Sequence, residues 1–518
     1  MREALKQMKN NDSLKKSFLY TFILGLIAHG YCFLNLTVSH DSLNDFYAAS
    51  QWQKASMGRI FYPIYITITR GRIVVPWLIG ILALCWTSLA VYLIVRIFRI
   101  EKASVIFMVS GICITNPTVY ALAATYIHDL DADLFALLFA VFAVLLWNTA
   151  MDSVNIKIKC GYLGLASAVL SIALGIYQSY ISVAIALIMF ICINNLLQKE
   201  EYITVLKQGV TGIAMIFLSG VVYLLELKVF SYFTGVSTMD SQKYNGLGNV
   251  SEVFTGNLGA KIIDVYMSFV EAFKNMILSS YPEKFTLFVQ GLLVISIVGI
   301  AILAMRKMDW KGNVLIVLLG IFLPFGMNIT CLLSNGVDHV LMQYAIWFIY
   351  LLALVFILWL AKEGTVPDKV KKVFQTMILL CVCFTIWENV QTANAIYVKK
   401  DLEYQTTLSY MTRVAERMEE QEDYVPGETP VVLLGGETIG NSKYGFERYQ
   451  VITGVEANSP ITYYDTFEDY LEYILGISVN LTEDSTIVNE QKVVEMPAFP
   501  KEGSIIMLDG TMVIKLSD

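Results

Sequence analysis

Residues 128–147 read HDLDADLFALLFAVFAVLLW, so that three aspartates, Asp129, Asp131 and Asp133, stand directly before an unbroken apolar run. Of the 518 residues, 56% are hydrophobic and only 16% are charged. A soluble domain carries roughly 25% charged residues, so most of this chain is expected to lie in a lipid bilayer. A charge at the bilayer centre costs about 2.5–3.5 kcal/mol. The aspartates must therefore lie at the water interface or in a polar cavity.

Apolar windows of about 20 residues, the length needed to cross a bilayer, predict about eleven transmembrane helices. They fall near residues 18–38, 73–98, 103–122, 133–150, 161–176, 177–196, 208–230, 285–305, 313–333, 341–361 and 373–392. The continuous run 161–197 is too long for one crossing, because a helix rises about 1.5 Å per residue. We expect it to break at 175–180, where a glycine, an amide and hydroxyl groups interrupt the apolar pattern.

Basic residues predict how these helices are oriented. With the N-terminus in the cytoplasm, every cytoplasmic loop carries lysine or arginine, as the positive-inside rule requires; examples are Arg96 and Lys307. Without the break at 175–180, all later loops would be inverted and the agreement would be lost. The segments then placed outside the membrane are 39–72, 117–132, 176–180, 231–284, 334–340 and the chain after about 393.

The composition becomes polar and acidic towards the C-terminus. We therefore expect a transmembrane domain over 1–395 and a small extracytoplasmic α/β domain over 396–518, in an otherwise all-α polytopic membrane protein. Helical spacing of apolar residues predicts a helix over 402–421. Residues 431–434 are typical of a strand, and two apolar runs around an Asp-Gly turn predict a β-hairpin over 505–516. The glycines after the first strand lack the GxGxxG pattern, and no nucleic acid partner is expected.

A second acidic cluster lies in the first outside segment. Ser42 and Asp45 match a capping box, which predicts a short helix that ends near Met57. Asp41 has two interpretations. It is either an acid near a helix N-terminus, stabilised by the helix dipole, or a general base that faces a cavity.

Three arginines of the same segment, Arg59, Arg70 and Arg72, lie on the side of the membrane where the positive-inside rule does not require them. Arginine in such a place needs an anionic partner. One candidate is a phosphate group, which arginine binds through forked, charge-assisted hydrogen bonds. The alternative is pairing with Asp41 and Asp45.

The aspartates that open the fourth apolar run also need partners. In a helix, Asp129 and Asp133 would share one face at i,i+4, where like charges repel, so a cation, a proton or an arginine is implied. A divalent cation held by Asp129, Asp131 and Asp133 is one possibility, although the glycine and glutamate of an EF-hand loop are missing.

The predicted break in the long apolar run brings hydrogen-bonding groups to the membrane surface. Tyr177, Gln178, Ser179 and Tyr180 offer neutral donors and aromatic faces, which suit the hydroxyl groups of a sugar. Alternatively, they satisfy backbone groups that are left open where two helices part. A weaker polar group lies near another outside loop and comprises Asn328, Asn335, Asp338, His339 and Gln343.

Several short motifs, taken in their order along the chain, resemble those of the Gtr-type (GtrII-like) glucosyltransferases. These are bacterial membrane enzymes usually grouped with the GT-C class. The resemblance spans roughly residues 18–440. The motifs are Ser39-His40-Asp41-Ser42-Leu43, Gly58-Arg59, Arg70-Gly71-Arg72, Pro76, Asp133-Leu134-Phe135-Ala136-Leu137 and Ile176-Tyr177-Gln178-Ser179-Tyr180.

This resemblance implies a glycosyltransferase that takes sugar from a polyprenyl-phosphate donor. Asp41 then matches the acid of the first outside loop, Arg59 the arginine of the Gly-Arg motif, and Asp133 the acid that heads the fourth helix. Many relatives have a second acid beside the first, but here that position is Ser42. The crowding of acids before the fourth helix leaves the alignment of the second acid open.

The implied chemistry assigns roles to these residues. A sugar hydroxyl needs a carboxylate to accept its proton, and direct displacement assisted by one such base inverts the anomeric carbon. We expect Asp41 to be this base, and Asp133 or Asp129 either to support the acceptor or to share the role of base. Arginine would stabilise the leaving phosphate. The residues expected to contact substrate are Arg59, Arg72, Asp131, His128, Tyr177 and Gln178.

The expected partners are the lipid-linked donor, membrane lipid, and a glycan or glycolipid acceptor at the surface of a bacterial cell membrane. Three other functions fit parts of the sequence. A transporter or flippase of lipid-linked sugars would place ionisable residues at mid-membrane and show internal repeats, and no repeat is visible. A polysaccharide polymerase or ligase would use pyrophosphate-linked donors. A structural scaffold would leave the outside arginines and acids unexplained.

Overall fold

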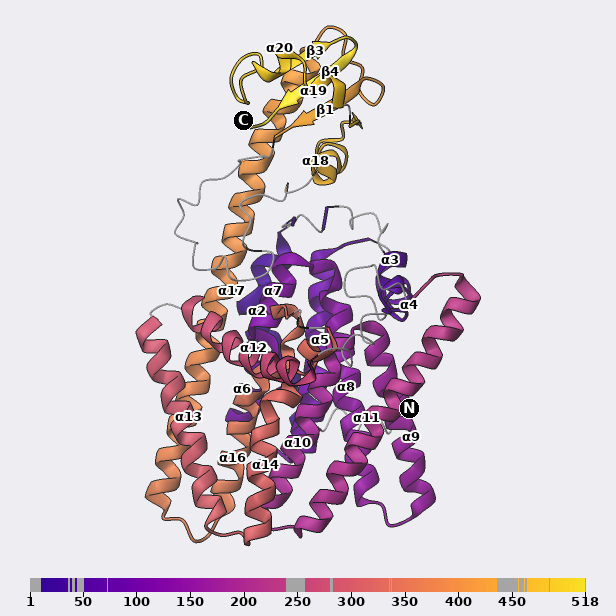
Figure 1. Cartoon of the computed structure of the whole chain (residues 1–518). Coiled ribbons are helices and arrows are strands. Elements are labelled where there is room, and N and C mark those ends of the chain that lie inside the picture. Colours follow the sequence, from indigo (N-terminus) through magenta and orange to yellow (C-terminus); the bar gives the residue numbers. More distant parts are fainter. Residues whose placement is uncertain are drawn as a thin grey trace. The chain divides into compact units, whose positions relative to one another are not determined.

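A computed structural model describes residues 11–35, 38–39, 42–43, 51–71, 73–238, 257–279, 283–334, 336, 338–435, 455, 461, 464–483 and 485–517. Helices predominate, and a small sheet forms near the C-terminus (Figure 1). The prediction of an all-α polytopic protein with a small α/β region is confirmed. Asp41, Asp45, Arg72 and Asn335 lie outside the described residues.

Within the described ranges, eleven helical segments are long and apolar enough to cross a membrane. Each overlaps one of the predicted windows, which confirms a multi-pass membrane protein. The segments are α2 (Asp12–Leu34), α5 (Pro76–Ile97), α6 with α7 (Ala103–Thr115, Pro117–Thr125), η1 with α8 (Ile127–Asp129, Leu130–Asp152), α9 (Ile156–Ile176), η2 with α10 (Gln178–Tyr180, Ile181–Leu197), α11 (Tyr202–Thr234), α13 (Glu283–Met305), α14 (Trp310–Met327), η5 with α16 (Tyr344–Phe348, Ile349–Lys362) and α17 (Asp368–Glu419).

The predicted break in the run 161–197 is present. Helix α9 ends at Ile176, and Tyr177 has extended backbone angles (φ −154°, ψ 116°) before the short 3-10 helix η2 begins. A second interruption, which was not predicted, separates α6 from α7. There Pro117 follows Asn116, and the residue before a proline is disfavoured in helical conformation.

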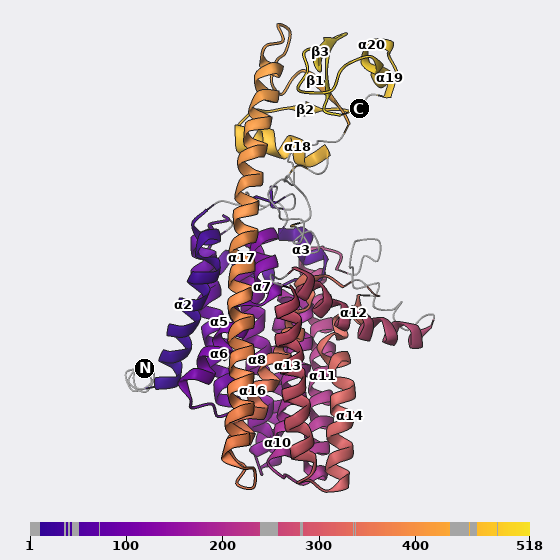
Figure 2. The same cartoon turned by 90° about the vertical axis from the view of Figure 1, so that its left-hand side faces the viewer.

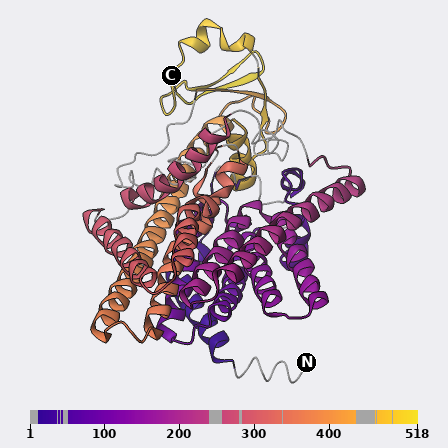
Figure 3. The ribbon, with the colours of Figure 1, turned by 60° about the horizontal axis from the view of Figure 1, so that its bottom comes forward.

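The apolar surface of the bundle is distributed as expected for helices in lipid. Helix α8 packs against α5, α9 and α10, and its Trp147 is completely buried. By contrast, α11 exposes large apolar side chains such as Ile213 and Phe217. Such a helix is stable in a bilayer because lipid tails are as apolar as the side chains. In Figure 3, the helices from α2 to α11 gather on one side of the bundle and α13 to α17 on the other.

Two short helices lie near one end of the bundle, where α8 begins and α9 ends: α3 (Gln51–Ser56) and α4 (Tyr62–Thr69) (Figures 1 and 2). The predicted first-loop helix corresponds to α3, whereas α4 was not predicted. The backbone N–H of Phe61 donates to the carbonyl of Gly175 over 2.8 Å, which fixes the loop to the end of α9. The remaining elements of the helical bundle are the longer helix α12 (Leu258–Ser279) and the short α15 (Ile329–Leu333) and η4 (Val340–Met342).

The chain divides into two compact units. The first comprises residues 1–34, 50–123 and 128–394, and the second comprises 35–49, 124–127 and 395–518. In the second unit, β1 is parallel to β2 and β4, while β3 and β4 form an antiparallel hairpin, in the order β2-β1-β4-β3. Its elements are β1 (Pro430–Leu434), α18 (Tyr464–Tyr470), η7 (Leu471–Leu475), β2 (Asn480–Leu481), α19 (Ser485–Val488), α20 (Gln491–Val494), β3 (Ile505–Leu508) and β4 (Thr511–Lys515).

Sequence patterns predicted much of this second unit. Strand β1 and the hairpin of β3 and β4 are confirmed. The hairpin turns at Asp509 and Gly510, which both have positive φ (48° and 81°), as a type I′ turn requires. The helix expected over 402–421 is part of α17 rather than a separate helix, and its Met411 and Met418 belong to the core that includes β1 and β4.

Candidate active site

Asp129, at the end of η1, is paired with two cations from the first outside segment. Its carboxylate forms an ion pair with the Lys54 ammonium group of α3, and its Oδ2 lies 3.4 Å from Nη1 of Arg59, in the turn between α3 and α4. The ring Nε2 of His128 lies 3.6 Å from its Oδ1. Asp129 is only 3% exposed. Lys54 and Arg59 together carry one more positive charge than the buried Asp129 carboxylate can neutralise.

Asp131, two residues further on, has a different cation. Its Oδ2 accepts hydrogen bonds from Nε of Arg70 (3.1 Å) and from the Tyr65 hydroxyl (3.0 Å). Tyr65 in turn accepts a hydrogen bond from the Trp86 indole over 2.8 Å. Arg70 also donates to the carbonyl of His128. This network joins the end of α4 to the first turn of α8, and both charged side chains are almost fully buried (2% and 0% exposed).

Asp133 lies in the first turn of α8 and is 2% exposed. In the described part of the chain, its Oδ1 has no hydrogen-bond partner. Arg59 and Lys54 are among the charges that act on it, as are Asp129 and Asp131. A buried polar group without a partner is costly, and where one persists in a native structure it is often functional. The Oδ1 of Asp131 also lacks a partner in this part of the chain, but the charge of Asp131 is paired with Arg70, so Asp133 is the better candidate for proton transfer.

Arg59 lies over the ring of Tyr177, with its guanidinium carbon 4.3 Å from the ring centroid. Burial lowers the pKa of Arg59, but the neighbouring Tyr177, Asp129 and Asp133 raise it above its ordinary value, so the guanidinium stays charged. Lys54 lies in the same way over the ring of Tyr62, at 4.9 Å. Aromatic faces therefore support both cations that pair with Asp129.

Gln178 holds the first outside segment against the helical bundle. Its amide nitrogen donates to the carbonyl of Met57 (3.0 Å) and to the hydroxyl of Tyr223 on α11 (2.9 Å). The Tyr223 hydroxyl in turn donates to the carbonyl of Gly58 over 2.9 Å. These bonds fix the backbone next to Arg59. Gln178, expected from the sequence to contact sugar, thus uses its amide N–H groups within the protein.

The structure brings together most of the described residues that the sequence singled out. Arg59, His128, Asp129 and Tyr177 form one cluster. Arg59 and Arg70 pair with Asp129 and Asp131 rather than with Asp41 and Asp45, the acids named from the sequence, which lie outside the described residues. Sequence reasoning missed Lys54, although its position outside the membrane carries the same signal as the arginines. It also missed Tyr65, Trp86 and Tyr223, for which the sequence offers no signal.

The possibility of a divalent cation at the three aspartates is not supported. Across the described ranges, no group of three or more histidine, cysteine or acidic side chains is arranged to hold a metal ion. Asp129 and Asp131 are instead paired with separate basic side chains, Lys54 with Arg59 and Arg70 respectively. Cationic side chains therefore take the place that a metal ion would have filled.

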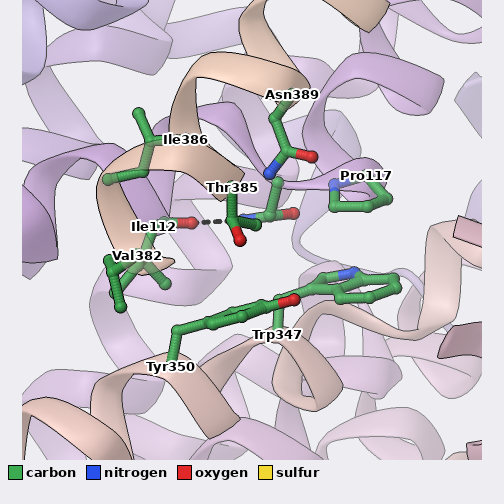
Figure 4. Close-up of a pocket in the computed structure, with 9 residues that line it drawn as sticks. Ile112, Pro117, Trp347, Tyr350, Val382, Thr385, Ile386 and Asn389 are labelled. Atoms are coloured by element: carbon green, nitrogen blue, oxygen red, sulfur yellow. Dashed lines mark hydrogen bonds between the residues drawn. The ribbon is translucent and has the colours of Figure 1, made fainter. Parts of the chain in front are cut away.

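A small cavity lies elsewhere in the first unit (Figure 4). The rings of Trp347 and Tyr350 form one wall, and Thr385 and Asn389 of α17 face them. Its lining contains aromatic, amide and hydroxyl groups but no carboxylate or basic side chain. It has room for about one water molecule. This cavity is therefore too small for a sugar, and the charged cluster remains the candidate active site.

Comparisons with known proteins add an independent view. The sequence model of the family described as "Glucosyl transferase GtrII" matches residues 30–360. No curated protein matches the chain. Among solved structures, the chain is similar to ArnT from Cupriavidus metallidurans bound to undecaprenyl phosphate, with 9% identity, 91% of each chain covered and a TM-score of 0.34. A structural similarity with a TM-score this low supports no assignment. The match to the family model does, and it confirms the resemblance found in the sequence.

Proposed function

The chain belongs to the GtrII glucosyl transferase family and is a membrane glycosyltransferase, and we propose that it moves glucose from a polyprenyl-phosphate donor to a cell-surface polysaccharide or glycolipid. The reaction takes place on the extracytoplasmic face of a bacterial cell membrane, with the N-terminus in the cytoplasm. This orientation follows from the basic cytoplasmic loops. Transfer inverts the configuration of the anomeric carbon.

One observation supports this proposal most strongly. Lys54, Arg59 and Arg70 of the first outside segment pair with Asp129 and Asp131 at the start of α8. Among the described residues, Asp133 forms no ion pair, and its Oδ1 has no hydrogen-bond partner. Glycosyl transfer from a lipid phosphate needs this combination, because cations must stabilise the leaving phosphate and a carboxylate must accept the proton of the acceptor hydroxyl.

In the proposed reaction, the acceptor oxygen forms a bond to the anomeric carbon while the bond from that carbon to the donor phosphate oxygen breaks. The polyprenyl phosphate leaves with the bonding electrons, and Arg59 stabilises the charge that develops on it. Asp133 takes the proton of the acceptor hydroxyl. Asp41, outside the described residues, is the second candidate for this role. One base and one displacement give inversion.

The test uses purified protein in liposomes with glucose-labelled polyprenyl phosphate and a glycolipid extract from cell envelopes. We expect label in a new glycosidic bond of inverted configuration, which NMR spectroscopy of the product would establish. Movement of the labelled lipid across the bilayer without a new bond would instead support a flippase. Transfer from the pyrophosphate-linked donor alone would support a polymerase or ligase.

A further inference from the structure

Asp129 differs from Asp131 in how many cationic side chains pair with it and in how exposed they are. Its two partners keep some contact with the surface: the Lys54 side chain is 11% exposed and that of Arg59 is 20% exposed. Arg70, the partner of Asp131, is 2% exposed and also binds a backbone carbonyl. Of these three cations, Lys54 and Arg59 are therefore the two that an incoming ligand can reach.

A phosphate group requires the same partners as the Asp129 carboxylate. Both are anions that accept charge-assisted hydrogen bonds from guanidinium and ammonium groups. In the structure Lys54 and Arg59 make these bonds to Asp129. A donor phosphate that binds here must replace Asp129 as the ion-pair partner of Lys54 and Arg59.

We propose that Asp129 is an internal substitute for the donor phosphate. When the donor binds, Lys54 and Arg59 leave Asp129 for the phosphate, and they return when the polyprenyl phosphate departs. Lys54 thereby becomes a phosphate-binding residue alongside Arg59. The exchange involves no covalent step, and it rests on the proposed polyprenyl-phosphate donor. Without a phosphate, Asp129 offsets part of the positive charge of Lys54 and Arg59.

The alternative is that Asp129 positions Lys54 and Arg59 so that they bind phosphate better. The two ideas predict opposite signs for one substitution. If Asp129 competes with the phosphate, Asp129→Asn frees the cations and tightens binding. If Asp129 positions the cations, the same substitution weakens binding. Because ligand and internal counter-ion affect each other reciprocally, we expect a gain of about fivefold or more.

The experiment measures binding of sugar-free polyprenyl phosphate to the purified full-length protein by calorimetry in detergent. Asp133→Asn is the matched control, because it removes one negative charge from the same helix turn without releasing a paired cation. We expect Asp129→Asn to bind more tightly than the wild type by at least about fivefold, and Asp133→Asn to gain clearly less. An equal gain in both variants, or no gain in Asp129→Asn, would overturn the exchange.

A second pair of variants keeps the test valid if Asp129→Asn does not fold. Lys54→Met removes one cation, and Lys54→Met/Asp129→Asn removes the ion pair as a whole while Arg59 remains. The double variant should bind polyprenyl phosphate more tightly than Lys54→Met alone; equal or weaker binding contradicts the proposal. A wild-type protein that binds no polyprenyl phosphate contradicts the donor assignment, whereas wild-type binding without the gain contradicts the exchange alone.

Discussion

Asp129 and Asp131 are two residues apart and are each paired with basic residues of the first outside segment, yet their surroundings differ. Asp131 and Arg70 are sealed, with hydrogen bonds to Tyr65 and to the carbonyl of His128. Asp129 shares two cations that remain partly exposed. Breaking a buried pair leaves an uncompensated charge. The sealed pair therefore serves stability, and the partly open one is suited to exchange with a ligand.

This comparison shows that the presence of opposite charges does not by itself identify a functional group. The number of hydrogen bonds and the exposure of each partner separate the two roles. Asp133 gives a third case, because it is nearly as deeply buried as Asp131 but forms no ion pair with any of the described residues. The three acids together predict three different responses to substitution.

The largest effect is expected for Asp133→Asn. The amide keeps the shape of the side chain but cannot accept the proton of the acceptor, so the transfer rate should fall by about 100- to 10,000-fold, the usual value of general-base help. Stability should not fall, because Asp133 forms no ion pair with the described residues that the substitution could break. Initial rates of sugar transfer and the thermal unfolding midpoint in detergent measure both. If Asp133→Asn transfers sugar at the wild-type rate, Asp133 is not the general base.

Arg70→Met should act mainly on stability. It leaves the Asp131 carboxylate buried beside Tyr65 without a cation, which costs about 3–5 kcal/mol of the free energy of unfolding. Denaturant unfolding of the purified variant measures this change. The double variant Arg70→Met/Asp131→Leu is the control, because it removes both charges and should recover much of the loss. If Arg70→Met is as stable as the wild type, the ion pair of Arg70 and Asp131 does not contribute to stability.

The membrane fold could be predicted from the sequence because its cause is local. Each span needs its own run of apolar residues, and the break at 175–180 follows from glycine and polar residues within one such run. The continuity of α17 could not be predicted. The change in composition near residue 395 coincides with the boundary between the two compact units, but it does not end the helix, because residues 393 to 401 contain no glycine or proline.

The candidate site was predicted in part, for a related reason. The sequence indicated that outside arginines need anionic partners, and Arg59 and Arg70 have them. It named Asp41 and Asp45 as the acids, which lie outside the described residues, whereas the arginines meet Asp129 and Asp131. These partners depend on how α3 and α4 fold back over α8. Lys54 was missed because a lone lysine on a short helix is ordinarily a solvated residue.

The smallest effect is expected for Tyr177, whose ring lies under Arg59. Burial raises the pKa of the Tyr177 phenol to about 12, so the side chain is neutral at physiological pH and attracts Arg59 through its ring. Tyr177→Leu removes this cation–π contact, which is worth about 0.5–2 kcal/mol. We expect the KM for the donor to rise by about 2- to 30-fold, with a smaller change in kcat. Tyr177→Phe keeps the ring and should stay close to the wild type. If the KM for the donor rises equally in both variants, the hydroxyl group of Tyr177 rather than its aromatic face supports Arg59. The position of Arg59 beside Asp129 would then have another cause.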